Sequence, residues 1–312
     1  MQENPDCFAP ASAPLADVED QLPLRVRMAT LAAIIVPFLG IVAAPFLFWG
    51  WGFSRLDFGM LLGFYILTML GITVGFHRLF THASFETPTF VKCIFAVLGS
   101  MAIQGSLFDW VAMHRRHLQH SDTKDDPHSP HNHGYGLWEI LRGAWHAHVG
   151  WFFVPNPPNM ARYIKDLRSN RALRAVNALF PLWIVLTFLI PALLGGLISQ
   201  SWRGALTGLI WGGLVRVFLV HHVTWSINSA CHLWGRRPHS CKDHSRNNLI
   251  FGLFAFGEGW HNTHHAFPRS ARHGLCWWEI DGSYWVIRIL SLLGLAWDIR
   301  LPEREIIKPV VG

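Results

Sequence analysis

Two long apolar stretches without charge occupy the first quarter of the chain. Met28–Ser54 contains no charged residue, and Phe58–Phe76 is equally free of charge. A helix rises about 1.5 Å per residue, so about 20 apolar residues cross the ~30 Å hydrocarbon core of a bilayer. The pattern therefore predicts two antiparallel membrane spans, at about residues 28–52 and 58–76, with a tight turn around Arg55 between them.

A second pair of apolar stretches follows in the second half of the chain. Ala175–Trp202 is uncharged, and Gly204–Val220 is interrupted only by Arg216, which we expect to snorkel or to face the protein interior. These stretches predict spans at about 177–200 and 204–225. The fold class predicted is an all-α membrane protein with four transmembrane helices in two hairpins and a cytoplasmic helical cap.

Two shorter apolar stretches, Cys93–Phe108 and Leu249–Gly257, do not reach the length that a span needs. If either crossed the membrane, the histidines of the chain would be divided between opposite faces. We therefore expect both stretches to form interfacial or buried helices.

The distribution of basic residues predicts the orientation. The two outer turns carry only Arg55 and Arg203, whereas the other helix ends are flanked by many basic residues: Arg25, Arg27, Arg78, Arg162, Lys165, Arg168, Arg171 and Arg174. Since short cytoplasmic segments are enriched in Lys and Arg, both termini are expected in the cytoplasm. Residues 1–27 lack the features of a signal peptide and are expected to form a polar cytoplasmic tail. The membrane domain is then 28–312, with its cap at 77–174 and 226–312.

Composition agrees with a membrane protein. Hydrophobic residues make up 51% of the 312 residues and charged residues only 15%, against about a quarter in ordinary soluble chains. The net charge of +6 is small beside that apolar content, so it favours a lipid bilayer rather than nucleic acid as partner. The five cysteines form no CxxC pair, which fits a reducing compartment.

Histidine is unusually abundant, with 19 residues, and many of them gather where the predicted cytoplasmic helix ends lie. The groups are His77 and His82 in GFHRLFTH, His114, His117 and His120 in WVAMHRRHLQHSD, His232 in NSACHLWG, and His261, His264 and His265 in EGWHNTHH. Residues three and four apart share one helix face, so His261, His264 and His265 can converge, as can His114 and His117. His77 and His82, five apart, share a face only where the helix ends or bends.

Neutral imidazole binds iron, zinc, copper and nickel, and so many ligands exceed a single tetrahedral site. Two metal ions are the economical interpretation. We interpret the motifs as containing no carboxylate ligand, unlike the Glu-x-x-His arrangement of ferritin-like di-iron bundles. They also show no zinc-hydrolase pattern, which favours a redox metal. The other histidines are interpreted as surface or hydrogen-bonded residues: His128, His131, His133, His146, His148, His221, His222, His239, His244 and His273.

These motifs resemble those of the integral-membrane fatty acyl desaturases, particularly the Δ9 acyl-CoA and acyl-lipid type with three histidine boxes. The resemblance extends from about Leu24 to Pro302. GFHRLFTH is similar to the first box, WVAMHRRHLQHSD with the following DDPHSP to the second, and EGWHNTHHAFP to the third.

The resemblance implies a cytoplasmic cap that holds two iron ions, with O2 as co-substrate. The implied ligands are His77, His82, His114, His117, His232, His261, His264 and His265, with Asn228 acting through a water molecule. The residues that would line the kinked acyl tunnel are Gln104, Trp110, Thr224 and Trp225. The chain departs from the family pattern at Leu118, where a ligand histidine is expected; His120 replaces that ligand only if the backbone bends.

The implied reaction introduces a cis double bond, expected at Δ9, into a saturated long-chain acyl-CoA or acyl-lipid. The chain has no CxxCH haem motif, iron–sulfur cysteine pattern or Gly-rich dinucleotide motif, so electrons must come from a separate carrier such as a ferredoxin, a rubredoxin or a small cytochrome. Arg115, Arg116, Arg236, Arg237, Arg269 and Arg272 offer a basic surface for that carrier or for the substrate headgroup, or simply face the lipid. Carboxylates that can orient the imidazoles are Asp109, Asp122, Asp125, Asp126, Glu258 and Asp281, of which Asp122, beside the second box, is the specific hypothesis.

Two alternatives remain open at this point. The same metal core can hydroxylate an acyl chain or an alkane, although the DPHSP and HNTHHAFP contexts are more similar to desaturases. A membrane metal transporter or sensor is a different class, but transporters place polar ligands near the bilayer midplane rather than at helix ends.

Overall fold

The computed structural model describes residues 22–155, 157 and 159–302. The predicted tail at residues 1–27 lies mostly outside this part of the chain. In the described part the regular elements are all helices, with only isolated β-bridges and no strand, as an all-α fold requires.

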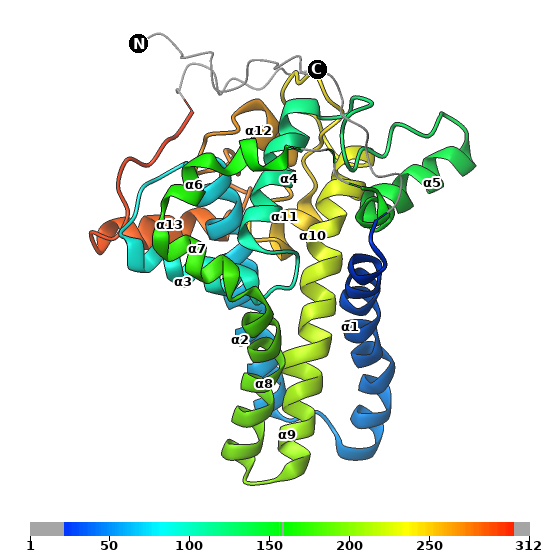
Figure 1. Cartoon of the computed structure of the whole chain (residues 1–312), viewed down its shortest axis with the longest axis vertical. Helices are drawn as coiled ribbons and strands as arrows, with labels where there is room; N and C mark the ends of the chain where they lie inside the picture. The colour runs from blue at the N-terminus through cyan, green and yellow to red at the C-terminus, as the bar shows by residue number, and fades with distance from the viewer. Residues whose placement is uncertain (1–21, 156, 158, 303–312) are drawn as a thin grey trace.

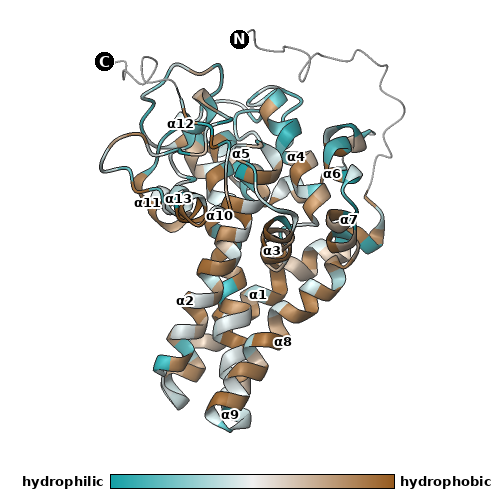
Figure 2. Ribbon diagram, turned by 90° about the vertical axis from the view of Figure 1, so that its left-hand side faces the viewer, coloured by the Kyte–Doolittle hydropathy of each residue, from teal (hydrophilic) through white to brown (hydrophobic). Residues whose placement is uncertain are grey.

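Four long helical segments are apolar and long enough to cross a membrane. They are α1 (Leu24–Trp51), α2 (Arg55–Leu70) continued by η2 (Gly71–Thr81), α8 (Phe180–Ser199), and α9 (Trp202–Gly208) continued by η5 (Leu209–Val215) and α10 (Arg216–Leu233). Figure 1 shows them side by side as a stalk, and Figure 2 shows how strongly apolar the stalk is. The four predicted spans are therefore present as helices, and they indicate a membrane protein.

The remaining helices form a head at one end of the stalk (Figure 1). We use the word head for the described residues in 82–179 and 234–302. Its longer helices are α3 (Thr89–Ser100), α4 (Leu107–His120), α5 (Leu137–His148), α7 (Arg171–Ala178) and α13 (Gly282–Leu292), and its shorter ones are η3 (Gly150–Phe153), η4 (Met160–Ile164), α6 (Lys165–Ser169), α11 (Leu249–Phe254) and α12 (His261–Ala266).

The two shorter apolar stretches form helices that are too short to span a bilayer. The first becomes α3, with 12 residues, and the second becomes α11, with 6 residues. Both belong to the head, as expected for interfacial or buried helices.

Local sequence explains where α2 begins. The Ser54 hydroxyl accepts a hydrogen bond from the Asp57 amide, and the Asp57 carboxylate accepts one from the Ser54 amide. This reciprocal pair satisfies two amides that the first turn of a helix leaves without partners. The charged residues between the first two apolar stretches therefore start the second helix.

Close helix packing in the stalk depends on glycine. A Cβ atom added to Gly208 of α9 would lie 2.3 Å from the carbonyl oxygen of Pro191 in α8, and one added to Gly195 of α8 would lie 2.1 Å from the Gly204 oxygen. Small residues let apolar helices approach closely where no hydrophobic effect draws them together.

Arg216 faces the protein interior and is fully buried. Its guanidinium donates to the Gly212 carbonyl at 3.0 Å, the Met101 carbonyl at 3.1 Å, and the Thr187 carbonyl at 3.0 Å. One side chain thus ties α10 to α8 and to the end of α3.

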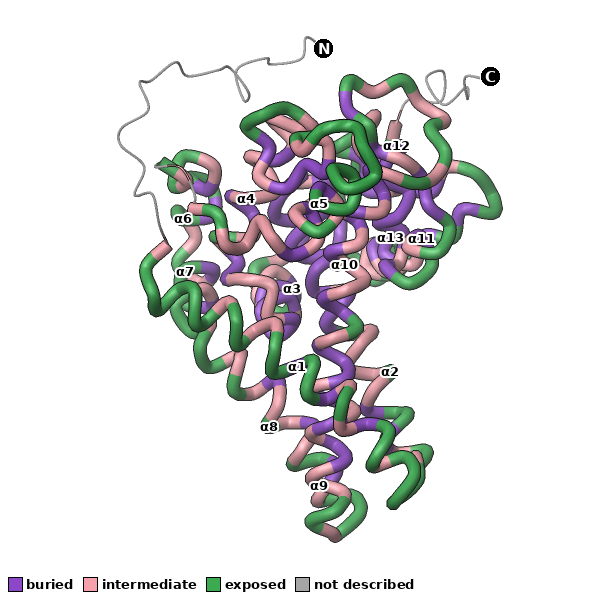
Figure 3. The backbone as a smooth tube through the Cα atoms, turned by 90° about the vertical axis from the view of Figure 1, so that its right-hand side faces the viewer, coloured by how far each residue is buried: buried purple, intermediate pink, exposed green. Residues whose placement is uncertain are grey.

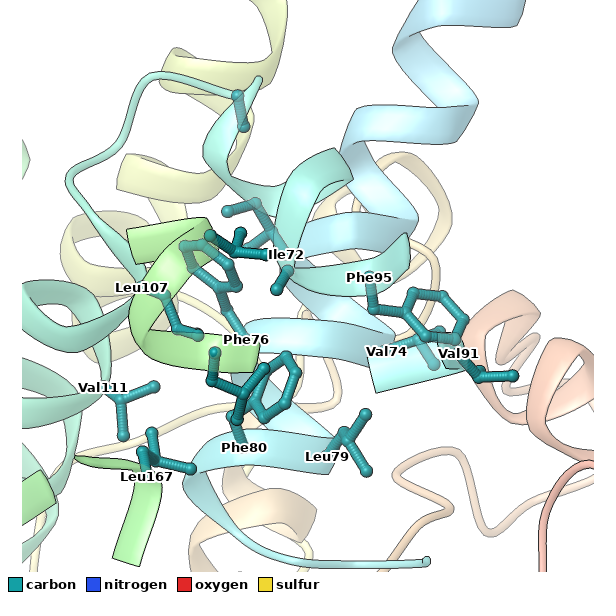
Figure 4. Packing of buried hydrophobic residues seen from close by; sticks show 14 of the residues in the cluster. Ile72, Val74, Phe76, Leu79, Phe80, Val91, Phe95, Leu107, Val111 and Leu167 are labelled. Carbon is teal, nitrogen blue, oxygen red and sulfur yellow. The ribbon is translucent and has the colours of Figure 1, made fainter. Parts of the chain in front are cut away.

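The main hydrophobic core lies where the stalk enters the head. Figure 4 shows Phe76 and Phe80 of η2 packed among side chains of α3 and α4, including Phe95 and Leu107. Figure 3 shows that buried backbone is concentrated in the head, while the stalk exposes much of its outer surface. The core therefore holds η2, which carries the first histidine motif, in a fixed position.

Candidate metal centre

Four histidines from three separate elements form a first cluster. His77 and His82 come from η2 and its C-terminal end, His114 from α4 and His264 from α12. Their ligand nitrogens all lie within 4.8 Å of one another. The Nε2 atoms of His77 and His264 are only 3.2 Å apart.

The π-helical winding of η2 brings His77 and His82 together. The His82 amide donates to the His77 carbonyl at 3.2 Å, an i→i+5 hydrogen bond. In this winding residues five apart are neighbours along the helix axis, and the two rings lie 4.7 Å apart. The five-residue spacing requires that the helix deviate from ordinary α-helical winding. The π-helical winding of η2 is that deviation.

A second cluster contains His117, His232, His261 and His265, again with ligand nitrogens within 4.8 Å of one another. The Nε2 atoms of His232 and His261 lie 3.1 Å apart. The two clusters are neighbours because α4 and α12 contribute histidines to both. All eight histidines that the family resemblance implies as ligands fall into these two clusters, whereas His120 of the second motif does not.

Carboxylates orient half of the eight rings. The Nδ1–H of His117 donates to Asp126 at 2.9 Å, that of His232 to Asp122 at 2.8 Å, and that of His265 to Asp243 at 2.6 Å. His77 donates in the same way to Glu258. Because the proton of each neutral ring sits on Nδ1, each Nε2 atom presents a lone pair. This arrangement prepares Nε2 as a metal ligand.

Four of the inward Nε2 atoms have no hydrogen-bond partner in the described part of the chain. The Nε2 atoms of His82, His114, His117 and His265 are buried and accept or donate no hydrogen bond within the described residues. Buried polar atoms without partners are costly and rare in native proteins. Nitrogen lone pairs that converge without protons between them fit a bound cation in each cluster.

Burial keeps four of the cluster rings neutral. Burial lowers the pKa of His82, His114, His261 and His264 well below the ordinary histidine value. For Asp126, burial alone would raise the carboxyl pKa, but the charge of His117 and its hydrogen bond lower the pKa overall. His82, His114, His261 and His264 are thus neutral, which is the state that metal binding requires. For His117, burial alone would lower the pKa, but the charge of Asp126 and its hydrogen bond raise it overall.

Comparison with known proteins identifies the family. A model of the fatty acid desaturase family matches residues 56–288, which is more than half of the chain. The chain belongs to the fatty acid desaturase family. Desaturases are oxidoreductases, so the redox interpretation of the histidine clusters agrees with the family.

Individual relatives cover most of the chain. A hex-5-enoyl-[acyl-carrier protein] acetylenase from Moorena producens is 44% identical over 276 residues, which are 88% of this chain and 86% of the relative. An sn-1 stearoyl-lipid 9-desaturase from Synechocystis is 41% identical over 254 residues, 80% of this chain and 74% of the relative. An icosanoyl-CoA 5-desaturase from Limnanthes douglasii is 40% identical over 265 residues, 83% of this chain and 68% of the relative.

The residues expected to line the desaturase acyl tunnel fall into two groups. The amide of Gln104 donates to the Thr224 hydroxyl at 2.5 Å, and Trp225 next to Thr224 is buried. Trp110 lies apart from these, with its ring stacked on His114 at 5.2 Å between centroids. Trp110 is therefore in direct contact with the first cluster.

Asn228 occupies α10 one turn before His232. Thr224, Asn228 and His232 are each four residues apart, so they share one face of that helix. This face leads from the Gln104 contact to the second cluster.

Three residues near the clusters were not singled out from the sequence. Asp243, which holds His265, lies 22 residues before it in a loop. His128 is buried with its ring stacked on His117 at 4.2 Å, and His273 is buried 4.6 Å from the His264 ring. The DPHSP motif was the one available signal for His128; nothing in the spacing pointed to Asp243 or His273.

Of the six carboxylates proposed from the sequence to orient imidazoles, three contact cluster histidines. Asp122, Asp126 and Glu258 contact cluster histidines, as described above. The other three do not: Asp109 accepts from Ser106 at the start of α4, Asp281 pairs with Arg78, and Asp125 is exposed.

Leu118 and His120 belong to neither cluster. Each cluster contains four histidines without these two residues. Both residues are half-buried on α4. The side chain that contacts the second box from outside is His128 rather than His120.

Of the six arginines in the predicted basic surface, only some have exposed side chains. The Arg115 guanidinium forms an ion pair with Asp166 and donates hydrogen bonds to three backbone carbonyls. Arg236, Arg237 and Arg269 are exposed. These three offer charge on the surface of the head for an acidic partner.

Proposed function

We propose that this chain is an integral-membrane, oxygen-dependent desaturase that introduces a cis double bond, expected at Δ9, into a saturated long-chain acyl group. The observation that carries the proposal is the pair of four-histidine clusters at one end of four apolar helices. A chain of the desaturase family with this donor set has both a site for two metal ions and a means of holding an apolar substrate.

The proposed ligands are His77, His82, His114 and His264 for one iron ion and His117, His232, His261 and His265 for the other. Asn228 is proposed to hold a water molecule at the second site, one turn from His232. Iron with O2 would supply the oxidising power to remove hydrogen from an unactivated methylene, which no side-chain acid or base can do.

The protein residues position the substrate. We propose that the acyl chain follows the α10 face that carries Thr224 and Asn228, with Gln104 fixing Thr224. Trp110, stacked on His114, closes the path beside the first cluster, and the buried Trp225 forms part of its wall. These two tryptophans are the apolar side chains beside the proposed path, where they would exclude water and so limit side reactions.

The membrane arrangement follows from the charge pattern. We propose that the four helices form two hairpins across the bilayer, with domain 28–312 in the membrane and its cap at 77–174 and 226–312 in the cytoplasm. Both termini and the metal centre are then cytoplasmic, because the basic residues flank that end of the stalk.

Two partners are proposed. The substrate is a saturated acyl-CoA or acyl-lipid, and the names of the relatives include lipid, CoA and acyl-carrier-protein substrates. A separate one-electron carrier, a ferredoxin, a rubredoxin or a small cytochrome, would bind the head near the exposed Arg236, Arg237 and Arg269.

The test is expression in a host that lacks unsaturated fatty acids, followed by mass spectrometry of the acyl chains. Desaturation makes the product two mass units lighter, and mapping the double bond gives its position. A product sixteen units heavier would instead show the hydroxylase alternative.

The matched variants are His114→Ala, which removes a cluster ligand, and His239→Ala, which changes a histidine outside both clusters. We expect no alkene from the first and normal alkene from the second. Metal flux into liposomes without oxygen consumption would support a transporter, although both clusters lie at one end of the stalk and not halfway along it.

A second candidate reaction has one observation in its favour. The 44% identical relative is named as an acetylenase, whose named substrate already contains a double bond. Supplying the host with a terminally unsaturated acyl chain and looking for a further loss of two mass units decides whether this chain also forms an alkyne.

A further inference from the structure

The two histidine clusters differ in the carboxylates behind them. Three rings of the second cluster, His117, His232 and His265, each donate to a separate aspartate. In the first cluster only His77 donates to a carboxylate, that of Glu258. Within the described residues no carboxylate pairs with His82 or His114.

Glu258, the carboxylate that contacts the first cluster, also forms an ion pair with Arg78. Arg78 donates to Glu258 at 3.1 Å and to Asp281 at 2.8 Å, and its side chain is fully buried. A third Arg78 contact, at 3.2 Å, reaches Nδ1 of His273. Arg78 shares its one positive charge between Glu258 and Asp281, so it offsets part of the negative charge that Glu258 brings to the first cluster.

In the described part of the chain, no arginine or lysine forms a salt bridge with the three aspartates of the second cluster. Asp122 accepts further hydrogen bonds from the His244 amide and the Ser129 hydroxyl, and Asp243 accepts from the Ser245 amide. These donors are neutral, so they hold the carboxylates in place without cancelling their charge. The second cluster thus has three negative charges in contact with its ligand rings.

We propose that the two clusters are unequal metal sites, and that the second cluster binds its ion first and at least about tenfold more tightly than the first. The inference rests on the proposed di-metal site. A carboxylate that accepts from Nδ1–H makes the imidazole a stronger ligand, and losing one such partner weakens metal binding about 10- to 100-fold. The second cluster has three carboxylate partners, whereas the first has one, which also pairs with Arg78. The second cluster should therefore bind its metal ion more tightly.

The consequence is a labile first site. When metal is scarce, the chain holds one ion in the second cluster and lacks the one in the first, so the availability of metal sets the fraction of complete centres. The first cluster includes His77 and His82 of η2 and contacts Trp110, so the exchangeable ion is the one on the Trp110 side of the centre.

The test is an anaerobic titration of the full-length, metal-free chain in detergent with Co²⁺ against a competing chelator. Co²⁺ in a histidine site reports binding by its visible absorption and needs no turnover. We expect two steps whose dissociation constants differ at least about tenfold. A single step, or two steps of equal affinity, would overturn the proposal.

Variants assign the steps to the clusters. His82→Ala, in the first cluster, should remove only the weak step. Asp243→Asn and, as a second isosteric variant, Asp122→Asn should weaken the tight step about 10- to 100-fold and leave the weak step unchanged. Loss of the tight step in His82→Ala would reverse the assignment and reject the proposal.

Asp166→Asn is the matched control, because that carboxylate pairs with Arg115 and contacts no histidine of either cluster. It should change neither step. Equal affinities in a chain that forms alkene would reject this inference alone, whereas stepwise binding in a chain that forms no alkene would reject the proposed function alone.

Discussion

Each carboxylate–histidine pair determines which ring nitrogen faces a cluster. Asp122 accepts from His232 and from the His244 amide with the same Oδ2 atom. Its place between the second box and α10 makes it a link between two ligand-bearing segments. The geometry agrees with the hypothesis that Asp122 orients a ligand, which the sequence motivated only by proximity to the second box.

We predict that Asp122→Asn lowers the metal content of the purified chain. Asparagine keeps the size of the side chain, but its amide lacks the negative charge that stabilises His232 as a ligand, and binding should weaken about 10- to 100-fold. Metal analysis after dialysis measures the effect, with Asp166→Asn as control. Unchanged metal content and unchanged turnover would remove Asp122 from the site.

Leu118 gives a prediction in the opposite direction. The family pattern places a ligand histidine at this position, and Leu118 follows His117 directly on α4. Leu118→His is therefore expected to preserve or raise the iron content, measured by elemental analysis of the purified chain. A clear loss of both iron and activity would reject the alignment of the second box.

At the residue scale, the cluster histidines could be predicted because their chemistry and spacing are unusual in an apolar chain. Asp243 could not be predicted, because its contact with His265 depends on the path of a loop rather than on a helical repeat. His128 and His273 were interpreted as surface or hydrogen-bonded residues; both are buried beside cluster rings, and the sequence pattern carries no information about that burial.

For the helices, the hydrophobic pattern predicts their positions and lengths, whereas tertiary packing determines their local winding. Lengths and apolar stretches predicted the four long helices to within several residues at each end. The π-helical winding of η2 could not be read from the sequence, because its glycines and apolar residues also suit an ordinary helix. Only the five-residue separation of His77 and His82 indicated that the helix must deviate there.

Close contact between η2 and α3 gives a prediction at this scale. A Cβ atom on Gly71 would lie 2.2 Å from the backbone nitrogen of Gly99, so Gly71→Ala must displace α3 from the start of η2. We expect a loss of about 1–3 kcal/mol in the free energy of unfolding and weaker metal binding in the first cluster. Thermal unfolding and the Co²⁺ titration measure the two effects.

Gly63→Ala is the control within the same long helix, because a Cβ atom at Gly63 meets nothing within 4 Å. It should leave both measurements unchanged. If Gly71→Ala behaves like Gly63→Ala, the contact between η2 and α3 does not position the histidines.

For the whole molecule, the arrangement of stalk and head makes a prediction about the two sides of the membrane. Helix α9, whose second residue is Arg203, lies at the far end of the stalk (Figure 1). Arg269 belongs to the head, which includes the described residues in 234–302. We expect Arg269→Cys to react with an impermeant thiol reagent from the cytoplasmic side only and Arg203→Cys from the opposite side only. Both variants are made in a chain whose exposed Cys276 is replaced by serine.

Labelling of both positions from the same side would contradict the proposed two-hairpin topology. The sequence predicted the existence of the four spans from hydropathy alone, but their orientation depends on the distribution of arginine and lysine, so it needs this separate measurement.

The central claim is that two metal-loaded histidine clusters together remove two hydrogens from an acyl chain. The most direct measurement is the mass of the product that the purified, iron-loaded chain forms from a saturated acyl substrate with O2 and a chemical reductant. The account predicts a product two mass units lighter with one cis double bond, and none from His114→Ala or His265→Ala. A product sixteen units heavier, or undiminished alkene from either variant, would contradict it.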